Sequence, residues 1–472
     1  MASERLTALD ASFLDVETTS AHMHVGWAAV FDPPESGPPP TFEQLRDHVA
    51  SRLHRAPRYR QRLAPVPLGL ARPVWVDDER FDVDRHLKRS RGASLAEVAG
   101  TVMSTPLGRS RPLWEMWIAD RLDDGRIGVV GKAHHCMVDG IAAVELAALL
   151  LDPSSEPPPA ERDDWRPAPA PGAGRRLVEG VVDRTFEQIE AAGSYARAAT
   201  SPVRAVGGIQ RTGRALMHSL SPARPIGALN DPISPYRSLA TLARPLDDLK
   251  KVKREYGATI NDVVLAVAAG GVRRFLERRG EAVPRLKAMV PVNVRSSGAA
   301  GELGNRISFL FMELPCDEPD PCRRLRALSL ATSEAKAARE PEGATAVLDL
   351  AAHAPSLVQR MVSRLVASPR TFNVVVSNIP GPQEPLYMLG CRLREAYPVV
   401  PLADRHALSI GFTSIAGGAY FGVYADRDSV PDADRLAEDI GAALDELLAS
   451  AEAARPRPRP RTPRAPREPA PV

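Results

Sequence analysis

Two adjacent histidines stand in the part of this sequence with the clearest chemistry. Residues 131–140 read GKAHHCMVDG, so His134 and His135 are followed, after three residues, by Asp139 and Gly140. Only ten histidines occur in 472 residues, and the arrangement His-His-x-x-x-Asp-Gly is specific enough to be treated as a motif. A strand-like run precedes it and an apolar helix-like run follows it. We therefore expect a strand-to-helix junction that holds these side chains firmly.

The spacing of the two histidines favours proton transfer over metal binding. Neighbouring side chains on an extended segment point to opposite sides, so the two rings cannot easily share one metal ion. The sequence also lacks H-E-x-x-H and a third clear ligand. A neutral imidazole accepts protons well near pH 7, and an alcohol needs such a base before it can attack an activated acyl donor such as a thioester. We predict that His135 faces a cavity as a general base, while His134 packs inward and supports the loop.

Asp139 and Gly140 are expected to shape the junction and not to react. Asp139 precedes the expected helix, so it either caps that helix or pairs with a buried arginine. Gly140 would let the backbone turn tightly into the helix.

Several other classes of protein are disfavoured by the composition and by missing motifs. The chain has no G-x-S-x-G elbow, G-x-G-x-x-G fingerprint or nucleotide-triphosphate loop. The formal charge of +3 includes six Arg and one Glu after residue 454, so the rest of the chain carries 3 − 5 = −2 and gives no reason to expect nucleic acid as a partner. Four cysteines without a C-x-x-C pair favour a reducing compartment over a zinc site. We expect neither a metal nor a cofactor.

Membrane contact, where it exists, is expected to be peripheral. The first residues lack the apolar core of a signal peptide, and the apolar run 263–272 is about half the ~20 residues that span a bilayer. We therefore expect a cytoplasmic protein, either free or bound at the inner membrane or lipid inclusions. Residues 175–220 contain arginines among apolar residues, which is typical of either a connecting helix pair or a helix lying on lipid. The Arg/Pro-rich tail, residues 455–472, is expected to be disordered.

The elements that must position the motif mix strands and helices without a strict βαβ rhythm, which predicts mixed α/β layers. The expected strands are residues 24–31, 73–76, 114–121, 126–133, 286–294, 307–314, 372–376, 406–415 and 420–425. The expected helices are residues 41–55, 94–104, 141–151, 246–256, 261–278, 329–339 and 432–449. Seven prolines between residues 153 and 172 mark a boundary. The expected units are a first domain (1–152), a proline-rich linker with connecting helices (153–237), a second domain (238–454) and the tail.

Further motifs resemble those of the bacterial wax ester synthase/acyl-CoA:diacylglycerol acyltransferase family. The His-His motif alone is shared with the wider group of chloramphenicol acetyltransferase and condensation domains. The motifs that narrow the resemblance are residues 9–14 (LDASFL), 23–26 (MHVG), 112–114 (PLW), 261–263 (NDV) and 377–382 (SNIPGP). The resemblance covers about residues 9–447.

The resemblance implies two acetyltransferase-like domains with a tunnel between them, in which acyl-CoA and a lipid hydroxyl meet at His135. The implied reaction transfers a long-chain acyl group from acyl-CoA, a co-substrate, to diacylglycerol or a fatty alcohol, and forms triacylglycerol or wax ester. Two alternatives stay open. One is an acyltransferase with another acceptor, such as a glycolipid or polyketide hydroxyl; the other is a catalytically silent lipid-binding scaffold.

The same resemblance implies roles for residues outside the His-His motif. Substrate contacts are expected at Asn261, Asp262, Asn378 and Trp114. Arg60 is the expected structural partner of Asp139. Structural interpretations compete with these roles: packing for Trp114, a helix N-cap for Asn261, and turn formation around Asn378.

Overall fold

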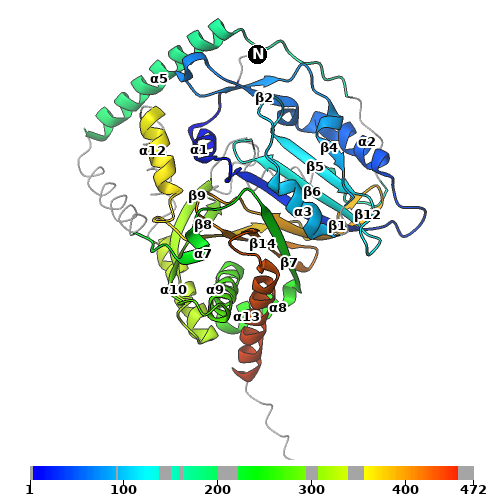
Figure 1. Cartoon of the computed structure of the whole chain (residues 1–472), viewed down its shortest axis with the longest axis vertical. Helices are drawn as coiled ribbons and strands as arrows, with labels where there is room; N and C mark the ends of the chain where they lie inside the picture. The colour runs from blue at the N-terminus through cyan, green and yellow to red at the C-terminus, as the bar shows by residue number, and fades with distance from the viewer. Residues whose placement is uncertain are drawn as a thin grey trace, which may run out of the picture.

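The computed structural model of the chain describes residues 4–91, 94–137, 150–156, 158, 163–199, 222–293, 307–337, 354 and 356–454 (Figure 1). Asp139, Gly140 and nearly all of the helix predicted at 141–151 lie outside the described residues. The tail at 455–472 and most of the second half of the segment 175–220 also lie outside them.

The first sheet holds the predicted base at the end of one of its central strands. Its strand order is β11-β12-β1-β6-β5-β4. These strands are β1 (His24–Asp32), β4 (Leu87–Arg89), β5 (Trp114–Ala119), β6 (Ile127–His134), β11 (Tyr387–Met388) and β12 (Cys391–Val399). β6 runs antiparallel between β1 and β5, and each residue of β6 is buried. A buried central strand fixes the direction of the side chain at its end.

Short elements surround this sheet. They are α1 (Ala8–Val16), α2 (Phe42–Arg52), α3 (Leu95–Ser104), the hairpin β2 (Gln61–Ala64) and β3 (Val74–Asp77), and the 3₁₀ turns η1 (Leu53–Arg55), η2 (Pro57–Arg60), η3 (Pro67–Gly69) and η4 (Val83–Arg85). Thr41 and Ser94 begin α2 and α3 with reciprocal capping boxes. The helix α5 (Ala173–Ala199) lies outside them, at the edge of the molecule (Figure 1).

The second sheet is mixed, with the strand order β7-β14-β13-β10-β8-β9. Its strands are β7 (Arg237–Pro245), β8 (Leu286–Asn293), β9 (Ile307–Leu314), β10 (Val374–Pro380), β13 (Leu408–Ile415) and β14 (Gly418–Asp426). The helices of this half are α7 (Gly227–Asn230), α8 (Leu246–Tyr256), α9 (Ile260–Arg278), α10 (Pro321–Ala337), α12 (Ser356–Val366) and α13 (Ala433–Ala454). β10 runs parallel to both β8 and β13, and α9 packs between α10 and α13. The prediction of mixed α/β layers is confirmed.

β12 ties the two halves together because it comes from the second half of the chain but pairs in the first sheet. Gly26 of β1 is opposite Val399 of β12. The carbonyl of Pro398 then lies against β14, where a Cβ on Gly422 would stand 2.2 Å from its oxygen. Only glycine allows this approach. The domain boundaries expected from the sequence stay a prediction, but the two sheets share this strand.

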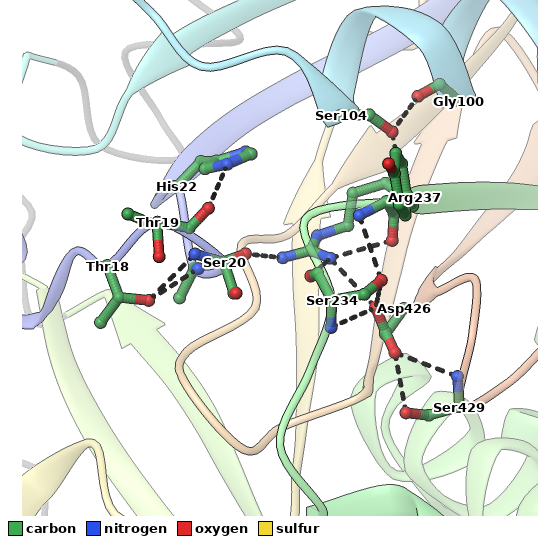
Figure 2. A network of polar contacts seen from close by, with 12 residues as sticks. Thr18, Thr19, Ser20, His22, Gly100, Ser104, Ser234, Arg237, Asp426 and Ser429 are labelled. Atoms are coloured by element: carbon green, nitrogen blue, oxygen red, sulfur yellow. Dashed lines mark hydrogen bonds and ion pairs between the residues drawn. The ribbon is translucent and has the colours of Figure 1, made fainter.

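A buried polar network joins the loop before β1 to the second sheet (Figure 2). Arg237, at the start of β7, donates to the backbone carbonyl of Ser20 and lies 3.3 Å from the Asp426 carboxylate. Ser234 and Ser429 donate their hydroxyls to the same carboxylate at 2.6 and 2.7 Å. A buried ion pair whose remaining oxygen lone pairs are filled in this way holds its partners in one geometry.

Most predicted strands and helices are confirmed, with two kinds of error. The helix predicted at 329–339 is the second half of α10, which begins at Pro321 because Asp320 accepts hydrogen bonds from the backbone N–H groups of Cys322 and Arg323. The sequence interpretation missed several elements altogether: α1, α12, β2, β4, β7, β11 and β12. Within the described ranges, no helix has the length and apolar character needed to cross a bilayer.

Candidate active site

His134 is the last residue of β6 and is enclosed by protein. Its Nδ1 accepts a hydrogen bond from the backbone N–H of Cys136 at 3.1 Å, which places the ring proton of the neutral form on Nε2. Nε2 lies 3.7 Å from a carboxylate oxygen of Glu17, which also pairs with Arg109. Burial, followed by the positive charge of Arg109, lowers the pKa of His134 to about 3. The ring is therefore neutral near pH 7 and bonded to the loop, and its supporting role stays a prediction.

His135 follows β6 in a turn and is half-buried. Its backbone N–H donates to the carbonyl of Met23 at 3.0 Å. Met23 has a left-handed backbone (φ 49°), which is uncommon for this residue type and typical of constrained sites. The His135 ring stacks on Phe13 of α1, with centroids 3.7 Å apart and planes 9° apart. The aromatic face therefore fixes the plane of the imidazole.

Phe13 is a site residue that the sequence interpretation missed. It belongs to the LDASFL motif, whose helix begins because Thr7 accepts a hydrogen bond from the backbone N–H of Asp10. The LDASFL motif was recognised in the sequence, but its distance along the chain from residue 135 gave no sign that the Phe13 ring contacts the His135 ring. The fold brings the two residues together.

His135 lines a small cavity between the two halves, with about 480 Å³ of empty space that includes its opening to solvent. Leu9, Phe13 and Val25 come from the first half, and Pro291, Ser377 and Val400 come from the second half. A larger apolar cavity, with about 880 Å³ of empty volume, adjoins it because Val25 and Ile379 line both. The wall of the larger cavity includes Trp27, Phe31, Met116, Leu386 and Ile415. A base beside an apolar cavity suits a reaction on the polar end of a hydrocarbon chain.

Asp262 caps a helix and has no contact with either cavity. Its carboxylate accepts from the backbone N–H of Thr259 at 2.8 Å and from the hydroxyl of Thr332 at 2.7 Å. Thr259 is thus the N-cap of α9, a role that the sequence interpretation gave to Asn261. The position of Asp262 does not support the predicted substrate contact, because its carboxylate is buried and already bonded.

Asn261 and Asn378 meet, but on the side of β10 away from His135. The Asn378 amide donates to the Asn261 side-chain oxygen at 3.4 Å and so links β10 to α9. Side chains alternate along a strand, and accordingly Ser377 and Ile379 line the cavities while Asn378 faces the helix. Ser377, and not Asn378, is therefore the polar residue of β10 in the lining of the His135 cavity, and the predicted substrate contact of Asn378 stays a prediction.

Trp114, the first residue of β5, and Arg60, the last residue of η2, line neither of these two cavities. The Trp114 indole N–H donates to the Tyr59 carbonyl at 2.8 Å, and its ring stacks on His86 with centroids 4.7 Å apart, so it is a packing residue. Arg60 is buried and pairs with Asp163. The predicted pair of Arg60 with Asp139 stays a prediction. No group of three or more metal-ligating side chains occurs among the residues that the structure places.

A buried lysine holds β6 from the opposite side. Lys132 donates to the carbonyls of Val102 and Thr105 at 2.7 and 2.5 Å and lies 3.6 Å from the Glu115 carboxylate. Burial lowers the pKa of this ammonium group to about 8, while Glu115 opposes that shift. The strand that ends at His134, just before His135, is thereby fixed to α3.

The fold is that of condensation domains, and it is shared with an acyltransferase. The first condensation domain of a calcium-dependent antibiotic synthetase has this fold, with a TM-score of 0.59 over 95% of this chain and 96% of that chain at 17% identity. A wax ester synthase/diacylglycerol acyltransferase from Marinobacter aquaeolei matches at a TM-score of 0.69 and 27% identity over 95% of this chain and 100% of that chain.

The sequence comparisons narrow this class to one family. Residues 6–264 match the catalytic domain of wax ester synthase/diacylglycerol acyltransferase, and residues 303–448 match the C-terminal domain of that family. Two probable diacylglycerol O-acyltransferases of Mycobacterium tuberculosis, tgs1 and tgs2, are 34% and 33% identical over 94% and 93% of this chain, and over 96% and 97% of their own lengths. The chain belongs to the wax ester synthase/diacylglycerol acyltransferase family and is an acyltransferase.

Proposed function

We propose that this enzyme transfers a long-chain acyl group from acyl-CoA to the hydroxyl of diacylglycerol or a fatty alcohol, with His135 as the general base. The observation that carries the proposal is the position of His135 in a cavity between the two halves, next to the larger apolar cavity. The names of the related proteins point to the same two acceptors.

The proposed reaction needs one base and no acyl-enzyme. A ring nitrogen of His135 takes the proton of the acceptor hydroxyl as its oxygen attacks the thioester carbonyl. The tetrahedral intermediate then collapses, the carbon–sulfur bond breaks, and the imidazolium returns its proton to the departing thiolate. The products are an ester and free coenzyme A. A positioned base of this kind contributes about 10²- to 10⁴-fold to a rate.

The arrangement of the site supports a division of work between the two histidines. Phe13 fixes the plane of the His135 ring, and the neutral His134 holds the loop through the Cys136 N–H. The larger apolar cavity would take a hydrocarbon chain and exclude water, which competes with the alcohol as a nucleophile. In this proposal acyl-CoA is a co-substrate, no cofactor takes part, and the enzyme works in the cytoplasm with peripheral contact to a lipid surface.

The experiment that tests the proposal is thiol release from palmitoyl-CoA with a panel of acceptors. The panel contains a diacylglycerol, hexadecanol, a glycolipid and a polyketide alcohol, and the products are identified by mass spectrometry. We expect turnover with diacylglycerol or hexadecanol. If only the glycolipid or the polyketide alcohol is acylated, that compound replaces diacylglycerol and the fatty alcohol as the proposed acceptor. If no acceptor supports thiol release, a catalytically silent scaffold is favoured.

A further inference from the structure

The helix α12 presents an apolar stripe to solvent. Leu357, Met361 and Leu365 recur at four-residue spacing and are 68%, 64% and 55% exposed. Residues four apart lie on one face of a helix, so the three side chains form a continuous ridge. The helix has no acidic residue, and Arg360 and Arg364 flank the ridge.

The helix α5 presents a second apolar stripe. Its exposed residues are Val178, Val181, Val182, Phe186 and Ile189. The opposite face of α5 is fixed to the body: Gly180 lies so close to Ala71 that a Cβ would stand 2.9 Å from that side chain, and Asp183 pairs with Arg5 at 2.7 Å. The apolar face of α5 is therefore directed outward by the packing of the other face.

The two helices lie at the same edge of the molecule (Figure 1). Arg184 of α5 donates to the carbonyl of Ala354, just before α12, at 3.4 Å, and Figure 1 shows the two helices side by side at that edge. We name these exposed apolar residues of both helices, together with Arg360 and Arg364, the α5–α12 surface. Large contiguous apolar surface on a folded protein marks a site of protein or membrane contact.

We propose that the α5–α12 surface docks the enzyme onto an anionic phospholipid bilayer, from which the lipid acceptor reaches His135. The apolar ridge would insert at the level of the headgroups, and the two arginines of α12 would meet lipid phosphates. Arg360 also lies 3.6 Å from Asp15 of α1, a long contact that leaves its guanidinium half exposed. The charge of α12 thus favours a negatively charged partner over an apolar protein.

The position of α12 connects this surface to the active site. α12 packs on α1, and α1 carries Leu9 and Phe13, which line the His135 cavity. A hydroxyl-bearing lipid that leaves the bilayer beside α12 would pass α1 to reach the base. This route rests on the proposed function, because only a lipid acceptor needs it, whereas bilayer binding itself does not.

Vesicle flotation of the full chain tests the docking. The probe is a vesicle of phosphatidylcholine with phosphatidylglycerol, and the variant is L357S/M361S/L365S. We expect at least tenfold weaker partition of the variant. The matched control L330S alters a leucine that is 65% exposed on α10, and it should bind as the unaltered protein does. Equal flotation of the triple variant and the unaltered chain would overturn the proposal.

Further variants separate apolar insertion from charge and from folding. R360Q/R364Q should lose binding to phosphatidylglycerol vesicles by about fivefold per arginine, with little change on pure phosphatidylcholine. V178S/V182S/F186S on α5 is the second apolar variant, used in case the α12 variant fails to fold. Sedimentation velocity gives the remaining outcome: if the unaltered chain is dimeric without vesicles and L357S/M361S/L365S is monomeric, the surface joins two copies and the bilayer proposal is overturned.

Activity assays distinguish failure of docking from failure of the proposed function. With a water-soluble short-chain alcohol, L357S/M361S/L365S should turn over as the unaltered enzyme does, whereas with vesicle-embedded diacylglycerol its kcat/KM should fall about tenfold. Loss of flotation in the variant, with no activity of either protein on any acceptor, would support docking and reject the function. Equal activity of both proteins on embedded diacylglycerol would reject docking as a requirement.

Discussion

The two sides of the chain at the end of β6 differ in what surrounds them, although both carry a histidine. On one side, His134 is enclosed, bonded to the Cys136 N–H, and kept neutral by burial. On the other, His135 is half-buried, stacked on Phe13, and faces a cavity lined by both halves of the chain. One residue of displacement along an extended backbone separates a support from a candidate base. Surroundings, and not side-chain type, assign the two roles.

The largest effect should come from removing the ring on the cavity side. His135→Ala should lower thiol release about 10²- to 10⁴-fold, because the acceptor hydroxyl loses its base. Circular dichroism and thermal unfolding should match those of the unaltered chain, since the ring is half-buried. His54→Ala, a substitution on η1, is the histidine control. If turnover of His135→Ala stays within threefold of that of the unaltered enzyme, His135 is not the base.

Filling the larger apolar cavity should change the selectivity of the enzyme for chain length. Ala396 of β12 lines the larger cavity, and Ala396→Phe would occupy part of it. We expect kcat/KM for palmitoyl-CoA or hexadecanol to fall at least tenfold relative to four-carbon analogues, because the longer chain loses its space. Ala396→Gly, which adds no volume, is the control. An equal fall for long and short chains would indicate general damage and not a chain-binding cavity.

Loss of the aromatic support should weaken the base without removing it. Phe13→Leu keeps an apolar side chain but loses a ring stack worth about 0.5–1.5 kcal/mol, so kcat should fall up to about tenfold. Phe13→Tyr should restore most of it. A fall in kcat with a nearly unchanged KM is expected when the base is misoriented but substrate binding is unaffected. If Phe13→Leu raised only KM, Phe13 would be a substrate contact and not a support of the ring.

The enclosed side should show its effect in the pH dependence of stability. The pKa of His134 is about 3 in the folded chain against about 6.5 unfolded, so the unfolded chain binds more protons as the pH falls below 6.5. Stability linked to this ring is therefore present above pH 6.5 and is lost toward pH 3, by about 3 kcal/mol at pH 4. Denaturant unfolding of His134→Gln between pH 6.5 and 4 should give a shallower decline. An unchanged slope would mean that the ring is not buried neutral.

Elements with a local sequence pattern could be predicted, whereas strand pairings between distant segments could not. The motif and the strand before it could be predicted because both are read from neighbouring residues of one short segment. The pairing of β12 with β1 could not, because it joins Gly26 to Val399 across nearly the whole chain. A local signal for β12 did exist: buried Cys391 and Leu393 alternate with exposed Arg392 and Arg394, which is typical of a strand with one face covered.

The candidate site shows the same limit. His134 and His135 could be assigned because strand alternation separates them. The positions of Asp262 and Asn378 could not be predicted, because the sequence does not show which residues of α9 are buried or which side of β10 lines the cavity. The cap of α9 was misplaced by two residues, at Asn261 and not Thr259, since both residue types favour that position. Contacts between distant segments, such as Phe13 with His135, appear only in the fold.

Chemical rescue with free imidazole shows whether the His135 ring is the base. His135→Gly leaves space beside Phe13 for a free imidazole, which would take the place of the missing ring. We expect added imidazole to restore thiol release by His135→Gly in a saturable manner. The restored rate should follow the basicity of substituted imidazoles. Thiol release by His134→Gly should not increase. Failure of every imidazole to restore His135→Gly, or equal rescue of His134→Gly, would contradict the account.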